Sequence, residues 1–385
     1  MELFSNLSTT LKHMIFGYTP PRCIGVDIST TAIKLVVLAP DSLQIANYRI
    51  RAIPPNLVIN GVIKDLEQLA VLLAQECLEL ATTYRDIAIA LPYSAIILRE
   101  LTCPQFRNRY QQAEFIRQKL IKELDNSELV FDFWNKPCRA TVERQGIDED
   151  FISRSKTDVV VETQAIHRSS RMLEAEVKTQ PIFRSSRMLA QSSGTLVAKK
   201  ELIEEYQALI QMAGMGVAAI DVEPFAIQYL LERVLCGTFA AQQQILVLDL
   251  GATRFKAWVL QNQQQLLFKE VTLAEIRSAG ANRAELNLVA ELTAVVSTVV
   301  KLVQLVRVEL LVQQKMNLVA PRVYLSGGNA LIPGVSARLE ELYLKPMVML
   351  SELLAPTNSQ IPAADLMRLV TALAVATWGH KIGSN

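Results

Sequence analysis

The stretch ILVLDLGATRFKAWVL, residues 245 to 260, is the most informative part of the sequence for the fold. An apolar run ends at Asp249, a short turn containing Gly251 follows, and a second apolar run resumes. Glycine gives a tight turn its backbone freedom and lets a ligand approach the peptide N–H groups, while Asp249 stands where a carboxylate could face a metal ion. Taken alone, these residues predict either an ordinary β-hairpin or a hairpin that cradles a phosphate.

The same plan occurs earlier in the chain, in CIGVDISTTAIKLVVL at residues 23 to 38. There an apolar strand leads to Asp27, a turn of small residues follows, and a β-branched strand resumes. The chain therefore has two hairpins of one design, more than two hundred residues apart. Repetition of the plan favours the phosphate interpretation over the ordinary hairpin.

A third element, VYLSGGNALIPGVSARLEELY at residues 323 to 343, reads as a strand, a Gly-Gly-Asn loop and a helix. Its glycines predict a helix N-terminus, where free N–H groups and the helix dipole favour an anion. No single one of the three motifs is specific, but their order along the chain is.

This ordered trio resembles the two phosphate loops and the adenosine loop of the actin-like ATPase superfamily. Within it, the chain resembles the PilM family of type IV pilus assembly proteins, which is itself similar to the cell-division protein FtsA. The turn Asp221-Val222-Glu223-Pro224 adds to the likeness outside the nucleotide loops. The stretches that carry the resemblance follow PilM order and span most of the chain: residues 25–38, 86–104, 196–231, 245–260 and 324–343.

The resemblance implies an α/β, actin-like (ribonuclease H-like) fold of two domains, with an inserted SHS2-type α+β subdomain. We expect an N-terminal tail or short amphipathic helix, a first domain in two parts, the inserted subdomain between those parts, and a second domain. In chain order the expected bounds are 1–21 for the tail, 22–97 and 196–241 for the first domain, 98–195 for the insertion, and 242–385 for the second domain.

The resemblance also implies a site for MgATP between the domains. Asp27 and Asp249 are expected to hold Mg²⁺ through water molecules, and the backbone of the two turns to hold phosphates. No catalytic residue is assigned, so we expect slow or absent ATPase activity. The residues expected to contact the nucleotide are Asp27, Ser29, Thr30, Thr31, Lys34, Asp249, Gly251, Ala252, Thr253, Gly327, Gly328 and Asn329.

The sequence departs from the family at three places. Ser29 stands where the family commonly has glycine, and Arg254 and Lys256 follow the second turn, where small hydroxylic residues are usual. The run Val271-Thr272-Leu273-Ala274 replaces the usual Gly-Gly step, and the helical subdomain that should follow is shorter.

The implied partner is a PilN-like inner-membrane protein, whose N-terminal cytoplasmic peptide would dock in a groove walled by residues 86–100 and 105–134. Other pilus assembly proteins and pilus motor ATPases are further implied partners, and self-association is left open. The implied location is cytoplasmic and peripheral to the inner membrane, with the membrane reached only indirectly. Two other interpretations stay open: a pseudo-ATPase scaffold without nucleotide, or an FtsA-like cell-division protein at the membrane. A sugar kinase is less favoured, because no convincing catalytic aspartate stands in a sugar-binding loop.

Composition is consistent with a globular protein and gives no reason to expect nucleic-acid binding. Half of the residues are apolar, and 39 Lys and Arg against 38 Asp and Glu leave a formal net charge of +1, so no global field attracts an anionic polymer. Five scattered cysteines without a metal spacing predict buried thiols in a reducing compartment.

Two segments each allow a purely structural interpretation and a functional one. Residues 1–21 have apolar side chains at helical spacing, and we favour a packed helix or a tail over a membrane contact because the polar face has few cations. Residues 139–193 contain RSSRML twice, at 168–173 and 184–189. We favour a flexible surface segment there over a basic contact site, since apolar residues are sparse. Residues 287–306 predict a buried core helix, and no transmembrane span is expected.

Overall fold

The computed structural model describes residues 22–59, 61–104, 106, 108–124, 129–135, 190–234, 244–261, 264–273, 283–314, 316–320 and 322–378. Residues 1–21 and 139–189, on which two expectations rest, lie outside this part of the chain. The described chain divides into two compact units. The smaller unit comprises the described residues of 96–203, and the larger unit those of 19–95 and 204–385.

The first sheet of the larger unit has three antiparallel strands extended by two parallel ones. Its strands are β1 (Ile24–Ile28), β2 (Ala32–Leu38), β3 (Ile45–Ala52), β6 (Asp86–Leu91) and β10 (Gly216–Val222), in the order β10-β6-β1-β2-β3. β1, β2 and β3 pair antiparallel, whereas β1, β6 and β10 pair parallel. Parallel neighbours need a crossover, and α2 (Leu66–Glu79) supplies it between β3 and β6, after the short β4 (Val58–Ile59) and β5 (Val62–Ile63).

The second sheet repeats this plan strand for strand. It contains β11 (Gln244–Leu250), β12 (Arg254–Gln261), β13 (Gln264–Thr272), β14 (Val323–Ser326) and β15 (Met347–Met349), in the order β13-β12-β11-β14-β15. Again the first three strands are antiparallel and the last two are parallel to the first. Its connections include α6 (Arg283–Gln314), η3 (Gly328–Leu331) and α7 (Val335–Tyr343). The chain then continues through α8 (Leu350–Leu354) and η4 (Ala355–Thr357).

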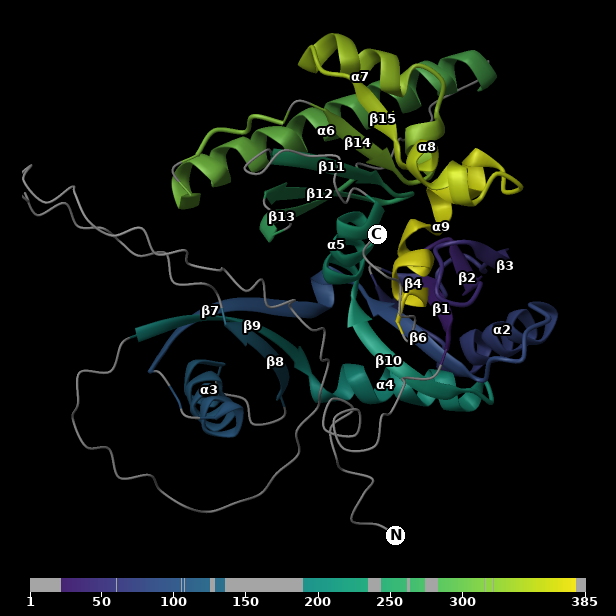
Figure 1. Ribbon diagram of the computed structural model, residues 1–385. Helices are drawn as coiled ribbons and strands as arrows, with labels where there is room; N and C mark the ends of the chain where they lie inside the picture. The colour runs from purple at the N-terminus through teal and green to yellow at the C-terminus, as the bar shows by residue number, and fades with distance from the viewer. Residues whose placement is uncertain are drawn as a thin grey trace, which may run out of the picture. The chain divides into compact units, whose positions relative to one another are not determined.

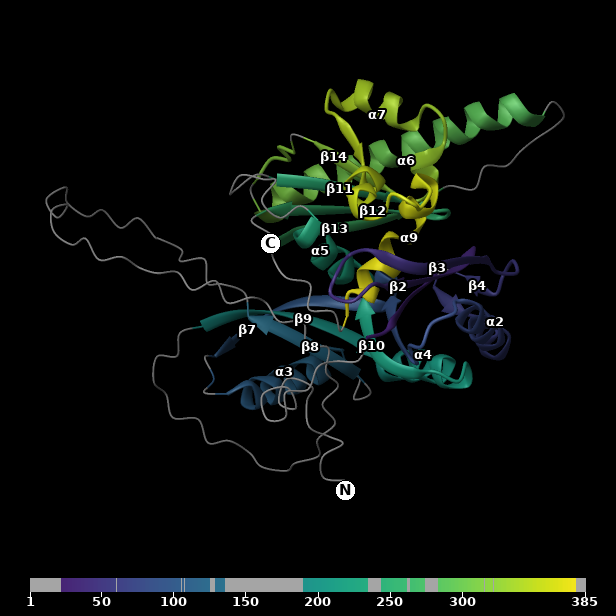
Figure 2. The same ribbon diagram turned by 45° about the vertical axis from the view of Figure 1, so that its right-hand side comes forward.

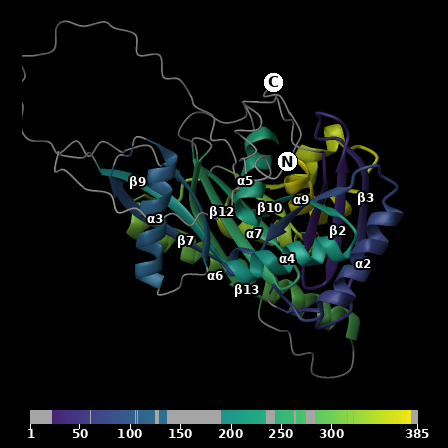
Figure 3. The ribbon, with the colours of Figure 1, turned by 90° about the horizontal axis from the view of Figure 1, so that it is seen from below.

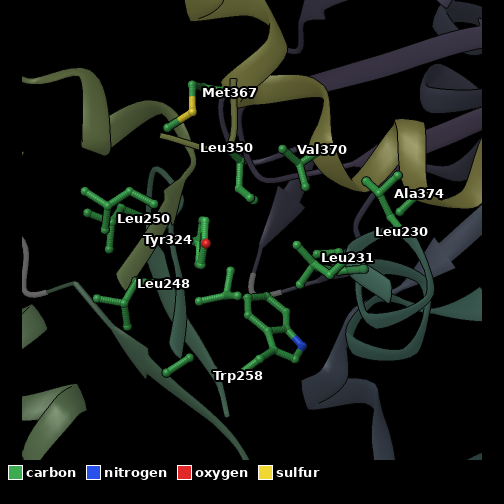
Figure 4. Packing of buried hydrophobic residues seen from close by; sticks show 14 of the residues in the cluster. Leu230, Leu231, Leu248, Leu250, Trp258, Tyr324, Leu350, Met367, Val370 and Ala374 are labelled. Atoms are coloured by element: carbon green, nitrogen blue, oxygen red, sulfur yellow. The ribbon is translucent and has the colours of Figure 1, made fainter. Parts of the chain in front are cut away.

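Two helices lie between the sheets, α5 (Glu223–Val234) and α9 (Ala363–Ala376), as two views of the ribbon show (Figures 1 and 2). One continuous apolar core covers both of them and the facing sheets. Figure 4 shows Leu231 of α5, Val370 of α9 and Trp258 of β12 within this core. α2 and the part of α4 (Lys200–Met212) from Glu204 lie on the outer face of the first sheet (Figure 3).

Helix α6 differs from the buried core helix that its sequence predicts. Val299 and Val306 are buried against the second sheet, but Val289 and Leu305 on the same helix are 63% and 43% exposed. An apolar helix sequence does not reveal how many of its faces a fold covers, and here only one is covered by the described residues. No helix of the described residues is both long and apolar enough to cross a membrane.

The smaller unit is an α+β element inserted between η2 (Tyr93–Ala95), which follows β6, and α4. It consists of β7 (Ile96–Pro104), α3 (Arg109–Leu124), β8 (Leu129–Asn135) and β9 (Ala190–Lys199), with the antiparallel order β7-β9-β8. Its own core joins Ile116 and Leu120 of α3 to Phe133 and Val197 of the sheet. Helix α3 begins at Arg109, and β9 includes residues 190–193, which belong to the segment expected to be flexible.

Three cysteines lie in the described residues, and all are buried thiols that form no disulfide, as expected of structural thiols: Cys23, Cys77 and Cys103. Cys138 and Cys236 lie outside the described residues.

Candidate functional site

The first hairpin places a carboxylate opposite a lysine. Asp27 on β1 pairs in register with Lys34 on β2, and the Lys34 ammonium donates to the Asp27 carboxylate at 2.7 Å. Both side chains are mostly buried, at 14% and 17% exposure. The turn between them is closed by the Ser29 N–H, which donates to the Ala32 carbonyl at 2.9 Å, and by the Ser29 hydroxyl, which bonds the same carbonyl at 3.0 Å.

The second hairpin repeats this pairing. Asp249 on β11 lies in register with Lys256 on β12, and their charged atoms are 3.9 Å apart. The other oxygen of Asp249 accepts a hydrogen bond from the Ser326 hydroxyl at 2.8 Å. The Gly251 N–H closes the turn by donating to the Arg254 carbonyl at 3.1 Å.

Gly251 is required for a reason that differs from the expected one. Its φ is not positive, so the turn does not need a glycine for backbone freedom. A Cβ at this position would instead lie 2.8 Å from the Arg254 carbonyl oxygen. Glycine is therefore needed for space within the turn, and any larger residue would push the two strands apart.

The two turns meet each other and the third loop. The hydroxyls of Thr30 and Thr253 are 3.5 Å apart, and Asn329 donates through its side-chain amide to the Gly251 carbonyl at 2.7 Å. The three motifs found separately in the sequence thus form one cluster, which we call the three-loop site. A phosphate placed between the turns would require the two threonine hydroxyls to separate, since no atom fits across a 3.5 Å hydrogen bond.

The sequence predicts that the Gly-Gly loop leads directly into a helix, but the structure differs. The loop enters the short η3, and α7 begins only at Val335, capped by Gly334 with φ of 88°. Gly327 has φ of 87° and lies so close to β11 that a Cβ would be 2.4 Å from the Leu250 carbonyl oxygen. Its N–H donates to the Met367 carbonyl at 3.0 Å. Gly327 therefore serves packing of the loop on β11, and only Gly328 has open space, with the Arg368 guanidinium 4.0 Å from an added Cβ.

Glu223 is a residue of this site that the motif analysis did not assign. It opens α5, directly after β10, and its carboxylate accepts from the Lys256 ammonium at 2.5 Å and from the Thr371 hydroxyl at 3.4 Å. Its own side chain is 8% exposed. The equal spacing of the two hairpins, in which a lysine follows the aspartate by seven residues, was the sequence signal for Lys256, whereas Glu223 was named only as part of the turn Asp221-Val222-Glu223-Pro224.

Burial and charge set the protonation of this cluster. Burial raises the pKa of Glu223, Lys256 opposes that rise, and the nearby charges of Asp27 and Asp249 add to it. Burial alone would lower the pKa of Lys256, but the carboxylates of Glu223, Asp249 and Asp27 outweigh it and raise that pKa. Lys256 consequently keeps its proton at any physiological pH, and a permanent cation lies among three acidic side chains.

Arg254, which follows the second turn, connects this turn to η2 at the end of β6. The guanidinium of Arg254 donates to Glu270 at 2.7 Å and to the Ser94 hydroxyl at 2.6 Å. The ring of Tyr93, next to Ser94, lies 4.2 Å from that of Phe268 on β13. The short helix η2, which follows β6, thus contacts the β12–β13 hairpin.

The donor set of the three-loop site suits an anion better than a divalent cation. Turn closure uses the amides of Ser29 and Gly251 and leaves those of Thr30, Thr31, Ala252 and Thr253 outside these hydrogen bonds. The carboxylates expected to hold Mg²⁺ already carry a lysine or a serine hydrogen bond. No group of three His, Cys, Asp or Glu side chains among the described residues could hold a metal directly. Magnesium held through water at Asp27 and Asp249 stays a prediction that these contacts do not favour.

Comparisons with known proteins agree with the sequence motifs. Residues 25–114 match a family model described as type IV pilus assembly protein PilM. A chain of the PilM–PilN type IV pilus biogenesis complex is 19% identical, with a TM-score of 0.67 over 94% of this chain and 99% of that one.

Two further structures are more distant. The ethanolamine utilization protein EutJ from Carboxydothermus hydrogenoformans is 15% identical, covers 98% of both chains and has a TM-score of 0.46. MreB5 of Spiroplasma citri bound to AMPPNP is 10% identical, with a TM-score of 0.38 over 87% of this chain and 92% of that one. The expected actin-like fold is confirmed by its likeness to the PilM–PilN chain over 94% of this chain, and the resemblance to the PilM family is confirmed over residues 25–114.

Proposed function

We propose that this chain is an actin-like adaptor of type IV pilus assembly, which binds the N-terminal cytoplasmic segment of a PilN-like inner-membrane protein. The observation that carries the proposal is the match of residues 25–114 to the PilM family together with a fold shared over 94% of the chain. The membrane protein would supply the tether, so the adaptor would lie in the cytoplasm at the inner membrane. Nucleotide binding in the three-loop site would regulate the adaptor, with little hydrolysis.

The smaller unit has the features that a short extended peptide needs in order to bind. β7 and β8 are the outer strands of its described sheet, and an extended peptide can pair with such an edge through main-chain hydrogen bonds. Specificity then comes from alternate side chains of the peptide that contact apolar groups. Ile97 on β7 is an apolar side chain of this kind, 41% exposed.

The experiment titrates a fluorescent peptide, copied from the cytoplasmic N-terminus of the cognate PilN-like protein, and measures anisotropy. We expect Ile97→Asp to weaken binding at least about tenfold, since a charge would replace an apolar contact. The matched control is Ile59→Asp, at an isoleucine of the larger unit that is 38% exposed. Binding of the native peptide no tighter than that of a scrambled one would refute the adaptor proposal.

We further propose that the three-loop site binds the phosphates of ATP or ADP. Two observations support this: the two turns and the Asn329 loop meet, and two lysines bring positive charge to the meeting point. Ligand at about 100 times its Kd should stabilise the native state by about 2.7 kcal/mol. The melting temperature should therefore rise with nucleotide.

This test compares two variants, each of which replaces a lysine that has an acidic partner. Lys34→Met removes a cation of the site and should reduce the thermal shift. Lys269→Met, which removes a cation paired with Glu309 at 3.2 Å outside the three loops, should leave the shift unchanged. Flat melting curves and flat calorimetric titrations for the unaltered protein would favour the alternative, a scaffold without nucleotide.

A further inference from the structure

The two hairpins of the three-loop site each contain their own countercharge. In both, a lysine lies directly across the strand pair from the aspartate, at Lys34 and at Lys256. The first lysine serves one carboxylate at 2.7 Å. The second lies between two, Glu223 at 2.5 Å and Asp249 at 3.9 Å.

Lys256 is positioned by the fold and not by a flexible surface contact. Its side chain is 13% exposed, and the neighbouring β12 residues Phe255 and Ala257 are fully buried. The pairing of β12 with β11 fixes its register, and α5 fixes Glu223. An ammonium held in this way is a resident cation, because its position does not depend on a ligand.

The carboxylates expected to hold a divalent ion already have ammonium partners. The Lys34 ammonium lies 2.7 Å from the Asp27 carboxylate, and the Lys256 ammonium lies 3.9 Å from the Asp249 carboxylate. A divalent cation near Asp249 would share a poorly hydrated region with the Lys256 ammonium, and like charges repel strongly there. A polyphosphate oxygen beside Lys256 would instead gain a charge-assisted hydrogen bond.

We propose that Lys256 takes the place of the divalent cation in this site, so that the chain binds nucleotide polyphosphates without magnesium. The inference rests on the proposed nucleotide binding and specifies its ionic requirement. The lysines then supply the positive charge that a metal would otherwise bring to the phosphates.

The decisive experiment needs no substitution. Isothermal titration and melting curves of the full-length protein are recorded with ADP and with ATP, once in magnesium chloride and once in EDTA. We expect affinities in the two conditions to agree within about threefold, whereas a metal-dependent site would lose tenfold or more, equivalent to at least about 1.4 kcal/mol.

Two substitutions locate the effect. Lys256→Met, which keeps an unbranched side chain of similar length and removes the charge, should lower the affinity in EDTA at least about tenfold, while Lys256→Arg should restore most of it. Lys269→Met serves as the control for loss of a lysine outside the site. If Lys256→Met does not fold, the arginine variant and the unaltered protein in EDTA still decide the question.

The possible failures are distinct. Binding in magnesium that disappears in EDTA would overturn the inference and leave the proposed nucleotide binding intact. Absence of binding in both conditions would overturn both. Equal binding in the two conditions that Lys256→Met leaves unchanged would show that Lys256 is not the substitute for the metal.

Discussion

Gly25 on β1 lies in contact with α9, and its missing side chain is what permits the contact. A Cβ there would lie 2.1 Å from the Ala372 carbonyl oxygen and 2.5 Å from the Ala376 nitrogen. Because these are backbone atoms of a buried helix, they have no rotamer by which to move away.

We expect Gly25→Ala to lower the free energy of unfolding by at least about 2 kcal/mol, the usual scale of overpacking in a core. Urea denaturation of the purified protein measures it. Gly328→Ala is the control, since its Cβ would meet only the Arg368 side chain at 4.0 Å. A Gly25→Ala midpoint equal to that of the unaltered protein would mean that α9 packs less closely on β1 than described.

Cys23 provides a test of alkaline stability. Burial raises the pKa of its thiol from 9.0 to about 12, and the charge of Asp86 adds to this rise. The unfolded thiol ionises above pH 9.0 while the folded thiol keeps its proton until about pH 12, so stability is complete below pH 9.0 and is lost as the pH rises toward 12.

Urea denaturation of the unaltered protein at pH 8.5 and pH 10.5 should reveal this loss, at about 1.4 kcal/mol per pH unit from this thiol. Cys23→Ala should show a shallower dependence over the same interval. Parallel curves for the two proteins would contradict the assignment to Cys23, whatever their absolute stabilities.

At the scale of single elements, the two hairpins could be predicted from sequence because their signals are local. Alternating apolar runs interrupted by Asp27 and by Asp249 specify two strands and a turn without reference to the rest of the chain. Their meeting point, where Thr30 contacts Thr253, follows from the fold that the ordered motifs indicated.

Other parts of the site could not be predicted, because they depend on tertiary neighbours. Glu223 belongs to another element, and only the fold of α5 onto the second sheet brings it to Lys256. The expectation that Gly251 supplies backbone freedom was also wrong in detail. A pattern of residue types indicates that a turn exists but does not reveal the crowding within it. For the same reason, the exposed face of α6 was not apparent from its apolar sequence.

The contacts of the β11–β12 hairpin also predict slow hydrolysis of a bound nucleotide. Hydrolysis needs a polar group free to orient a water molecule, and here Glu223 is held by Lys256 while Asp249 is held by Ser326. We expect phosphate release to be far slower than about one per second, an ordinary enzyme rate. A coupled phosphate assay with Glu223→Gln as the background control measures it, and release near one per second that this variant abolishes would contradict the expectation.

At the scale of the whole molecule, the two compact units have separate cores. Ile116 belongs to the core of the smaller unit, and Leu373 of α9 belongs to the core that joins both sheets of the larger unit. Because α9 contacts both sheets, we expect the larger unit to unfold as one cooperative domain and the smaller unit to unfold separately.

Differential scanning calorimetry of the full chain should show two transitions. Ile116→Ala and Leu373→Ala each remove a fully buried side chain and should each cost about 2 to 5 kcal/mol. Each variant should lower only the transition of its own unit. A single transition displaced by both variants would show that the two units unfold together.

The contact of α9 with the first sheet has a consequence for how the protein is made. The Cys23 thiol donates to the Trp378 carbonyl, 355 residues later in the chain. At a synthesis rate of about 5 to 20 residues per second, the ribosome needs roughly 20 to 70 s to add those residues. During that interval the newly made β1 and β2 lack the helix that covers their apolar face. Nascent chains of this protein should therefore depend on chaperones that bind such surfaces until translation has passed α9.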